Sequence, residues 1–202
     1  LAAGVAHEIN NPLAFILGYA HLLQRQAEGQ LAADLGIIEE ESLRAKEIVD
    51  GLLDLSRPLP AAAEPVDLRA LSDDVVSRLG EARLLDGVRV SIDGSASAPG
   101  DPEKLRQVLV NLVRNAAEAA GSGGRVAVRL AERDGSAEVA VEDSGPGIPT
   151  EQRARLFEPF FSTKGPGKGA GLGLPTVYGI VKQSGGAIYA TSEPGKGARF
   201  DI

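Results

Sequence analysis

The sequence predicts an α+β chain in which an N-terminal helical hairpin, paired into a dimeric four-helix bundle, is followed by a two-layer α/β sandwich. Apolar residues recur at helical spacing from residue 1 to residue 57, whereas helical and alternating patterns are mixed beyond residue 66. The stretch between them is rich in proline and alanine, a composition that stops a helix and separates domains. We therefore expect the hairpin at residues 1–57, a linker at 58–65 and the sandwich at 66–202.

Each arm of the expected hairpin carries one apolar stripe. The first stripe contains Val5, Ile9, Leu13, Ile16, Ala20 and Leu23, and the second contains Ile38, Ala45, Ile48, Leu52 and Leu55. The connection at residues 27–33 is short, so the two helices are expected to run antiparallel. Because two helices cannot close a core alone, the pattern predicts a homodimer of hairpins.

The remainder of the chain alternates between helix and strand patterns. Helices are expected at 68–79, at 102–120 and in a segment ending near residue 184, and strands at 88–92, 125–130, 137–142, 187–192 and 198–202. The helix at 102–120 has the clearest limits. Asp101 and Pro102 suit an N-cap and a first helical residue, and Gly121 suits a stop.

Composition excludes several classes of function. The net charge is −7, of which −5 falls between Leu1 and Arg57, and this balance argues against a nucleic-acid partner. The chain has no cysteine, which excludes disulfides and cysteine-ligated metals and fits a cytoplasmic location. No apolar run is long enough for a membrane span, so we expect no membrane contact by this fragment. The chain lacks methionine and a signal peptide, and we interpret it as a fragment of a longer protein whose membrane anchoring stays open.

His7 is the first candidate for chemistry. It is followed by Glu8 and, one helical turn later, by Asn11, and this spacing places His7 and Asn11 on one helix face away from the apolar stripe. A neutral imidazole nitrogen is a nucleophile, and an adjacent carboxylate can take up the other ring proton. For an isolated pair, an ordinary surface histidine beside a solvated glutamate is the alternative. His21 has no comparable neighbours.

A carboxamide stripe runs along the expected helix at 102–120. Gln107, Asn111 and Asn115 are four residues apart and lie amid apolar residues. Their carbonyl oxygens suit a hard cation, and Mg²⁺ bound to a nucleotide needs few protein oxygens, so one asparagine ligand is sufficient. A solvent-facing polar side of the helix explains the same stripe equally well.

Glycine is concentrated in the second half of the chain, with 16 of 25 glycines from residue 121 onward. The segment Asp143-Ser144-Gly145-Pro146-Gly147 follows a strand, so its backbone can approach a flat ligand while the carboxylate accepts from an exocyclic amine. The same pattern is common in turns. The segment 165–173 alternates glycine five times before a helix, which is typical of a phosphate cradle and predicts a mobile lid. It matches neither the Rossmann nor the P-loop motif.

Taken together and in order, five segments resemble the H, N, G1, F and G2 boxes of sensor histidine kinases. They are His7-Glu8-Ile9-Asn10-Asn11-Pro12, Asn111-Leu112-Val113-Arg114-Asn115-Ala116, Asp143-x-Gly145-x-Gly147, Leu156-Phe157-Glu158-Pro159-Phe160-Phe161-Ser162-Thr163-Lys164 and Gly169-x-Gly171-x-Gly173-Leu174. The resemblance spans nearly the whole chain. It implies a dimerisation and phosphoacceptor hairpin followed by a catalytic ATP-binding domain of the kind shared with Hsp90, gyrase and MutL. The F and G2 boxes look most like the nitrogen-regulation branch.

The resemblance also implies a role for each matching residue. His7 would be the phosphoacceptor, Glu8 its acid/base partner, and Asn11 a group that positions water for phosphatase action. Asn115 would ligate Mg²⁺ with Asn111 beside it, and Asp143 would receive the adenine amine. The pocket, the lid and the phosphate contacts would come from Gly145, Gly147, Thr163, Lys164, Gly169, Gly171, Leu172 and Gly173. Two features depart from the family pattern and affect the lid contacts: the lid is short, and position 119 is alanine where some relatives carry a basic residue.

The function implied is that of an autophosphorylating protein histidine kinase. Using ATP and Mg²⁺, it would phosphorylate His7 and pass the phosphoryl group to an aspartate of a response regulator, with phosphatase activity as a further role. One alternative is a related ATPase that uses nucleotide to change shape without a phosphoenzyme, and it has no use for His7, Glu8 and Asn11 together. The other is a degenerate dimeric scaffold, which the presence of Asn115 and Asp143 argues against.

Overall fold

The computed structural model describes residues 2–56, 64–162 and 171–202. Within these ranges, the side chains of residues 2–8, 44, 47, 48, 50–56 and 64 are outside the description. The chain divides into two units, one made of residues 1–57 and 159–172 and the other of residues 58–158 and 173–202. Each unit is described by itself below.

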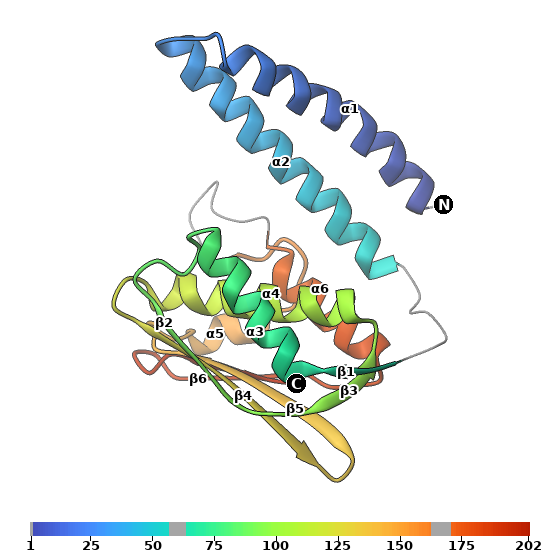
Figure 1. Ribbon diagram of the computed structural model, residues 1–202, viewed down its shortest axis with the longest axis vertical. Coiled ribbons are helices and arrows are strands. Elements are labelled where there is room, and N and C mark those ends of the chain that lie inside the picture. The colour runs from blue at the N-terminus through green and yellow to red at the C-terminus, as the bar shows by residue number, and fades with distance from the viewer. Residues whose placement is uncertain (1, 57–63, 163–170) are drawn as a thin grey trace. The chain divides into compact units, whose positions relative to one another are not determined.

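The first unit contains the expected helical hairpin. Helix α1 (Ala2–Gln24) and helix α2 (Gln30–Ser56) lie side by side and run antiparallel (Figure 1). The side chains of Ala20, Leu35, Ser42 and Val49 are buried in the hairpin. Near the connection, the imidazole Nδ1 of His21 lies 3.6 Å from Glu39 Oε1, which links the two helices. The predicted hairpin is therefore confirmed.

The hairpin leaves a regular set of apolar side chains exposed. In α1, Ile9, Ile16 and Leu23 are seven residues apart and 42, 45 and 50% exposed. In α2, Leu31 and Ile38 repeat the same spacing and are also exposed. The sequence predicts one stripe on α1, and the structure divides it, because Ala20 is buried in the hairpin whereas the three residues at heptad spacing face outward. A stripe of this kind is typical of a helical bundle that lacks its partner.

The second unit is a two-layer α/β sandwich. In chain order its elements are β1 (Glu64–Asp67), α3 (Leu68–Glu81), β2 (Arg89–Gly94), β3 (Ser97–Gly100), α4 (Pro102–Ala120), β4 (Arg125–Arg133), β5 (Ser136–Asp143), α5 (Thr150–Arg153), α6 (Gly173–Gln183), β6 (Tyr189–Ser192) and β7 (Ala198–Asp201). Five strands form a sheet in the order β2-β4-β5-β7-β6, in which β2 and β4 are parallel and the other pairs antiparallel. Figure 1 shows α3, α4 and α6 on one face of this sheet. The predicted sandwich is confirmed.

The hydrophobic core lies between these helices and the sheet. Its most deeply buried apolar side chains are Val75, Leu112, Val113, Val126, Val128, Val141, Val177 and Ile180. They come from all three covering helices and from β4 and β5, so the alternating strand pattern points its apolar residues toward the helical layer. The core therefore fixes the position of α4 against the middle of the sheet.

Helix α4 has the limits that the sequence predicts. The Asp101 side chain accepts hydrogen bonds from the backbone N–H groups of Glu103 and Lys104, at 2.9 and 3.4 Å, and Pro102 is the first helical residue. Gly121 caps the other end. An N-cap of this kind contributes about 1 kcal/mol to stability.

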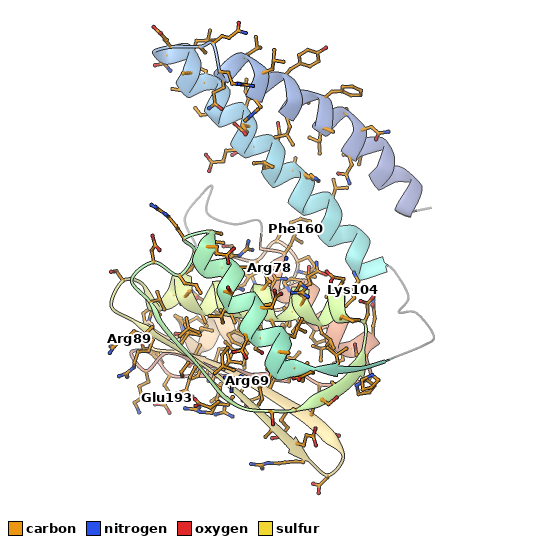
Figure 2. All side chains as sticks on the ribbon, in the orientation of Figure 1. Arg69, Arg78, Arg89, Lys104, Phe160 and Glu193 are labelled. Atoms are coloured by element: carbon orange, nitrogen blue, oxygen red, sulfur yellow. The ribbon has the colours of Figure 1, made fainter. Side chains whose placement is uncertain are left out.

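A charged cluster joins α3 to α4 on the surface. Asp74 of α3 pairs with Arg78 one turn later, at 3.0 Å, and its second oxygen pairs with Arg106 of α4. Arg106 also approaches Glu103, at 3.4 Å. Figure 2 labels Arg78 on α3. Because these groups are partly exposed, each ion pair contributes little to the free energy of unfolding. The pair between Asp74 and Arg106 joins α3 to α4 and restricts sliding of one helix along the other.

Three short elements were not expected from the sequence. Strands β1 and β3 form a separate antiparallel pair, in which Pro65 lies opposite Pro99. Residues 64 and 65 of the expected linker thus belong to a strand. The third element is the four-residue helix α5. Proline removes a ladder donor and is usually read as a strand breaker, yet it is tolerated in a two-stranded edge pair.

Among the described residues, no helix combines the length and the apolar character that crossing a membrane requires.

Candidate functional site

Two asparagines of α4 meet the first residue of α6. A Cβ atom placed on Gly173 would lie 3.1 Å from Asn111 Oδ1 and 3.5 Å from Asn115 Nδ2, and both asparagines are half-buried. The Asn111 amide donates to the backbone carbonyl of Gln107 at 3.0 Å, which fixes the direction of its carbonyl oxygen. The carboxamide stripe is therefore not a fully solvated helix face, because part of it meets the N-terminus of another helix.

This arrangement has the chemistry of a site for phosphates and a hard cation. The first backbone N–H groups of a helix lack partners within the helix, and together with the helix dipole they attract anions. The Asn111 Oδ1 atom already faces Gly173. Asn115 faces Gly173 with its Nδ2 atom, and rotating its carboxamide by half a turn would present its oxygen instead. In the part of the chain that the structure describes, no three His, Asp or Glu side chains gather as a metal site. The two carboxamides are the kind of oxygen donor that Mg²⁺ takes when phosphate oxygens and water supply its other ligands.

Asp143 ends β5, and its side chain is buried. Its Oδ1 accepts a hydrogen bond from the backbone N–H of Gly145 at 2.8 Å, and the backbone N–H of Ala198 also acts on the carboxylate. Burial raises the pKa of the Asp143 carboxyl above its ordinary value, the two N–H donors oppose this, and the Glu142 charge raises it further. A carboxylate held in this way is suited to accept a hydrogen bond from a ligand amine.

The loop after Asp143 is packed tightly against its neighbours. A Cβ on Gly145 would lie 2.6 Å from the Ala119 carbonyl oxygen at the end of α4. A Cβ on Gly147 would overlap the carbonyl oxygen of Glu193, at the beginning of the turn between β6 and β7. Both positions therefore require glycine for close backbone approach. Helix α4 therefore contacts both parts of the candidate site. Its middle carries Asn111 and Asn115 beside Gly173, and its C-terminal end contacts the loop after Asp143.

The remaining predicted site residues lie outside this region or outside the described residues. The backbone of His7 and Glu8 is in α1, but their side chains are not described, whereas Asn11 is exposed on the same helix. Gly171 and Leu172 are in the first unit, where the carbonyl of Gly171 accepts from the Phe160 N–H at 3.0 Å. Residues outside the description are Thr163, Lys164 and Gly169.

Sequence reasoning missed the turn that supports the Asp143 loop. Gly197 ends this turn, Ser192 and Ala198 flank it, and all three contact Asp143 or its loop through hydrogen bonds or close backbone approach. A turn is indicated by the run Ser192-Glu193-Pro194-Gly195-Lys196-Gly197. Its partner Ile148 is far away in the sequence, because α5, α6 and β6 lie between them. No local signal indicates that pairing.

Two family models match the chain. Residues 1–59 match the His Kinase A (phospho-acceptor) domain, and residues 100–202 match the histidine kinase-, DNA gyrase B- and HSP90-like ATPase. The chain belongs to the sensor histidine kinases, as the resemblance of its five boxes predicts. The nitrogen-regulation branch and the domain boundaries stay predictions.

Named relatives and solved structures agree with this family. The sensor histidine kinase ZraS of Escherichia coli O157:H7 is 40% identical over 207 residues, which cover 100% of this chain and 45% of ZraS. Full-length ShkA in complex with AMPPNP matches 99% of this chain and 44% of its own, with a TM-score of 0.81 and 28% identity. ThkA in complex with the response regulator protein TrrA matches 98% of this chain and 59% of its own, with a TM-score of 0.66 and 29% identity. The chain spans about half the length of ZraS.

Proposed function

We propose that this chain is the core of an ATP-dependent kinase that phosphorylates its own His7. Residues 1–57 would form the phosphoacceptor hairpin, 58–65 a linker and 66–202 the ATP-binding domain. The observation that carries the proposal is that one chain holds both halves of the reaction. The His7-Glu8 pair lies on α1, and the sandwich has two asparagine carboxamides at the start of α6.

The nucleotide would lie along α4. Asp143 accepts the adenine amine, and Gly145 and Gly147 let the backbone approach the base. At the other end, Asn115 ligates Mg²⁺ with Asn111 beside it, and the α6 N-terminus at Gly173 receives the phosphates. The bound Mg²⁺ would neutralise negative charge on the transferring phosphoryl group. The roles of Thr163, Lys164, Gly169, Gly171 and Leu172 in the lid and the phosphate contacts rest on the family resemblance.

The chemistry at His7 is an in-line phosphoryl transfer. The neutral imidazole nitrogen attacks the γ-phosphorus, a nitrogen–phosphorus bond forms, and the bond to the oxygen that bridges the β- and γ-phosphorus atoms breaks, so that ADP leaves. Glu8 takes up the proton on the other ring nitrogen. The residue pair is adjacent in α1, which supports this division of roles.

The phosphoryl group would then pass to an aspartate of a response regulator. Asn11 is exposed on α1, four residues after His7, and the same helix exposes Phe15, Tyr19 and Leu22. Aromatic and aliphatic side chains of this kind suit a protein partner. ThkA, solved with the response regulator TrrA, has the same fold. We also assign Asn11 a part in phosphatase action and place this core in the cytoplasm, where ATP is the phosphoryl donor.

A homodimer of hairpins would complete the bundle. The heptad-spaced residues Ile9, Ile16 and Leu23 remain exposed in the single hairpin, together with Leu31 and Ile38 of α2. Two copies of this surface can form the core of a four-helix bundle, which would remove these side chains from water.

Phosphorylation with γ-labelled ATP and Mg²⁺ tests the proposal. The chain is compared with its His7→Gln variant and, as a matched control, with a variant of its other histidine, His21→Gln. We expect acid-labile, base-stable label on the wild type and on His21→Gln and none on His7→Gln. Steady phosphate release without label, unchanged in His7→Gln, would overturn the kinase in favour of an ATPase that makes no phosphoenzyme. Absence of nucleotide binding by the wild type would leave the degenerate scaffold.

A further inference from the structure

The turn between β6 and β7, residues 193–197, is hydrogen-bonded to the loop after Asp143. The backbone N–H of Gly195 donates to the carbonyl of Pro146 at 2.7 Å. The backbone N–H of Ile148 donates to the hydroxyl of Ser192 at 2.8 Å. Figure 2 labels Glu193, the first residue of this turn. Hydrogen bonds therefore hold the loop after Asp143 against the turn between β6 and β7.

Ser192 makes contacts with the loop, with the turn and with α5. It is the last residue of β6 and is 4% exposed. Its hydroxyl accepts from Ile148 and donates to the carbonyl of Gly197 at 2.7 Å. Its backbone carbonyl accepts from Arg153 Nη1 at 3.2 Å, and Arg153 Nη2 donates to Thr150 Oγ1 at 2.6 Å. The hydroxyl thus donates one bond and accepts one, and the Ser192 carbonyl is bound by Arg153.

The bond to Gly197 connects Ser192 with Asp143. The carbonyl of Gly197 and the N–H of Ala198 belong to the same peptide unit, which is planar. The carbonyl end of this unit is bound by the Ser192 hydroxyl, and its N–H end acts on the Asp143 carboxylate. Gly197 itself packs closely on Asp143, since a Cβ there would overlap the Asp143 carbonyl oxygen. Fixing one end of a planar peptide fixes the direction of the other, so Ser192 sets the direction of a backbone N–H beside Asp143.

We propose that Ser192, held in place by Arg153, is a positioning residue that orients the Asp143 carboxylate for adenine recognition. The inference rests on the proposed function, in which Asp143 accepts the adenine amine. Without the Ser192 hydroxyl, the Gly197–Ala198 peptide loses the bond that fixes its direction beside the Asp143 carboxylate. Asn111 and Asn115, the proposed Mg²⁺ and phosphate residues, lie at another part of α4 beside Gly173 of α6, and the Ser192 change leaves them in place.

Comparing ATP with inosine triphosphate tests this role, because inosine carries a carbonyl where adenine carries its exocyclic amine. The full chain and its Ser192→Ala variant are titrated with each nucleotide in the presence of Mg²⁺. We expect Ser192→Ala to bind ATP about tenfold more weakly and inosine triphosphate within about twofold of the wild type, the range expected for loss of one hydrogen bond to a charged group. Ser72→Ala is the matched control, since Ser72 is 2% exposed and donates to Leu68 in its own helix at 2.7 Å.

A second pair of variants keeps the test valid if Ser192→Ala does not fold. Arg153→Met removes the side chain that holds the Ser192 carbonyl, and Arg155→Met is its control, because Arg155 pairs with exposed Glu158 at 2.9 Å instead. We expect Arg153→Met to lower the preference for ATP over inosine triphosphate about threefold, in line with partial loss of one hydrogen bond. Arg155→Met should leave that preference unchanged.

The outcomes separate the inference from the proposed function. A reduced preference for ATP in the Ser192 and Arg153 variants, with unchanged controls, supports the positioning role. Equal weakening for both nucleotides would show a merely structural role and overturn the inference, and so would an unchanged preference. If the wild type bound neither nucleotide, the proposed function itself would fail, and the inference with it.

Discussion

Replacing Gly197 by alanine tests how closely the turn between β6 and β7 packs on the Asp143 strand. Gly197 has a backbone φ of +78°, and a Cβ atom there would overlap the carbonyl oxygen of Asp143. Gly195, two residues earlier in the same turn, has a φ of +79°, and a Cβ there would meet nothing within 4 Å. Both substitutions therefore place an alanine in a left-handed backbone conformation, but only the Gly197 substitution also brings a Cβ atom into the Asp143 carbonyl oxygen.

The expected magnitudes follow from these two terms. A left-handed backbone conformation costs an alanine about 1–2 kcal/mol, so Gly195→Ala should lower the free energy of unfolding by about 1 kcal/mol. Gly197→Ala carries the same cost and adds the shift needed to relieve the overlap, about 1–3 kcal/mol as for other overpacked sites. It should also weaken ATP binding, because the displaced strand carries Asp143.

Urea unfolding followed by tyrosine fluorescence measures the difference. In a Tyr19→Phe background the remaining tyrosines, Tyr178 and Tyr189, both lie in the sandwich. An extra loss of about 2 kcal/mol would move the midpoint by about 1 M urea at an m-value of about 2 kcal/mol/M. Equal midpoints for Gly195→Ala and Gly197→Ala would refute the close packing of Gly197 on Asp143.

Three further changes have defined outcomes. Asp143→Asn should raise the free energy of unfolding at neutral pH and abolish ATP binding. Because burial raises the pKa of Asp143 above its ordinary 3.8, the wild type loses stability as the pH rises from 3.8 through that raised pKa. The stability advantage of Asp143→Asn should therefore vanish in urea titrations below pH 3.8, and an advantage that persisted there would contradict the assignment. Asp101→Ala should lower the free energy of unfolding by about 1 kcal/mol, the usual value of a lost N-cap, and thermal melting would detect it. Ile16→Glu should convert the dimer to a monomer in light scattering, and an unchanged mass would argue against the heptad surface.

Elements with local signals could be predicted from the sequence, as α4 shows. Asp101, Pro102 and Gly121 mark its two ends through backbone chemistry within a few residues, and the structure places both ends there. Strands β1 and β3 have no such signal, because each is short and Pro65 and Pro99 interrupt the strand pattern. Their pairing joins chain segments that are separated by the whole of α3 and β2, which periodicity cannot detect.

In the candidate site, too, residues with a local pattern could be predicted, whereas contacts that depend on packing could not. Asn111, Asn115 and Asp143 could be found because carboxamide spacing and a strand followed by glycines are visible along the chain. That Asn111 and Asn115 meet Gly173 depends on how α4 and α6 pack, and the sequence shows the three residues far apart. Ser192 was missed for the same reason, since its hydroxyl bonds Ile148 and its importance appears after the sheet is assembled.

The place of β7 in the sheet has a consequence for synthesis on the ribosome. This strand follows β6 in the chain, yet it lies between β5 and β6 and brings Ala198 to Asp143. The hairpin with His7 is made before the sandwich, whereas β5 must wait for about 55 more residues, or about 3–11 seconds at about 5–20 residues per second. During that interval the nascent chain carries His7, but β7 has not yet brought Ala198 to Asp143. Translation therefore delays the proposed phosphorylation of His7 until β7 has been made.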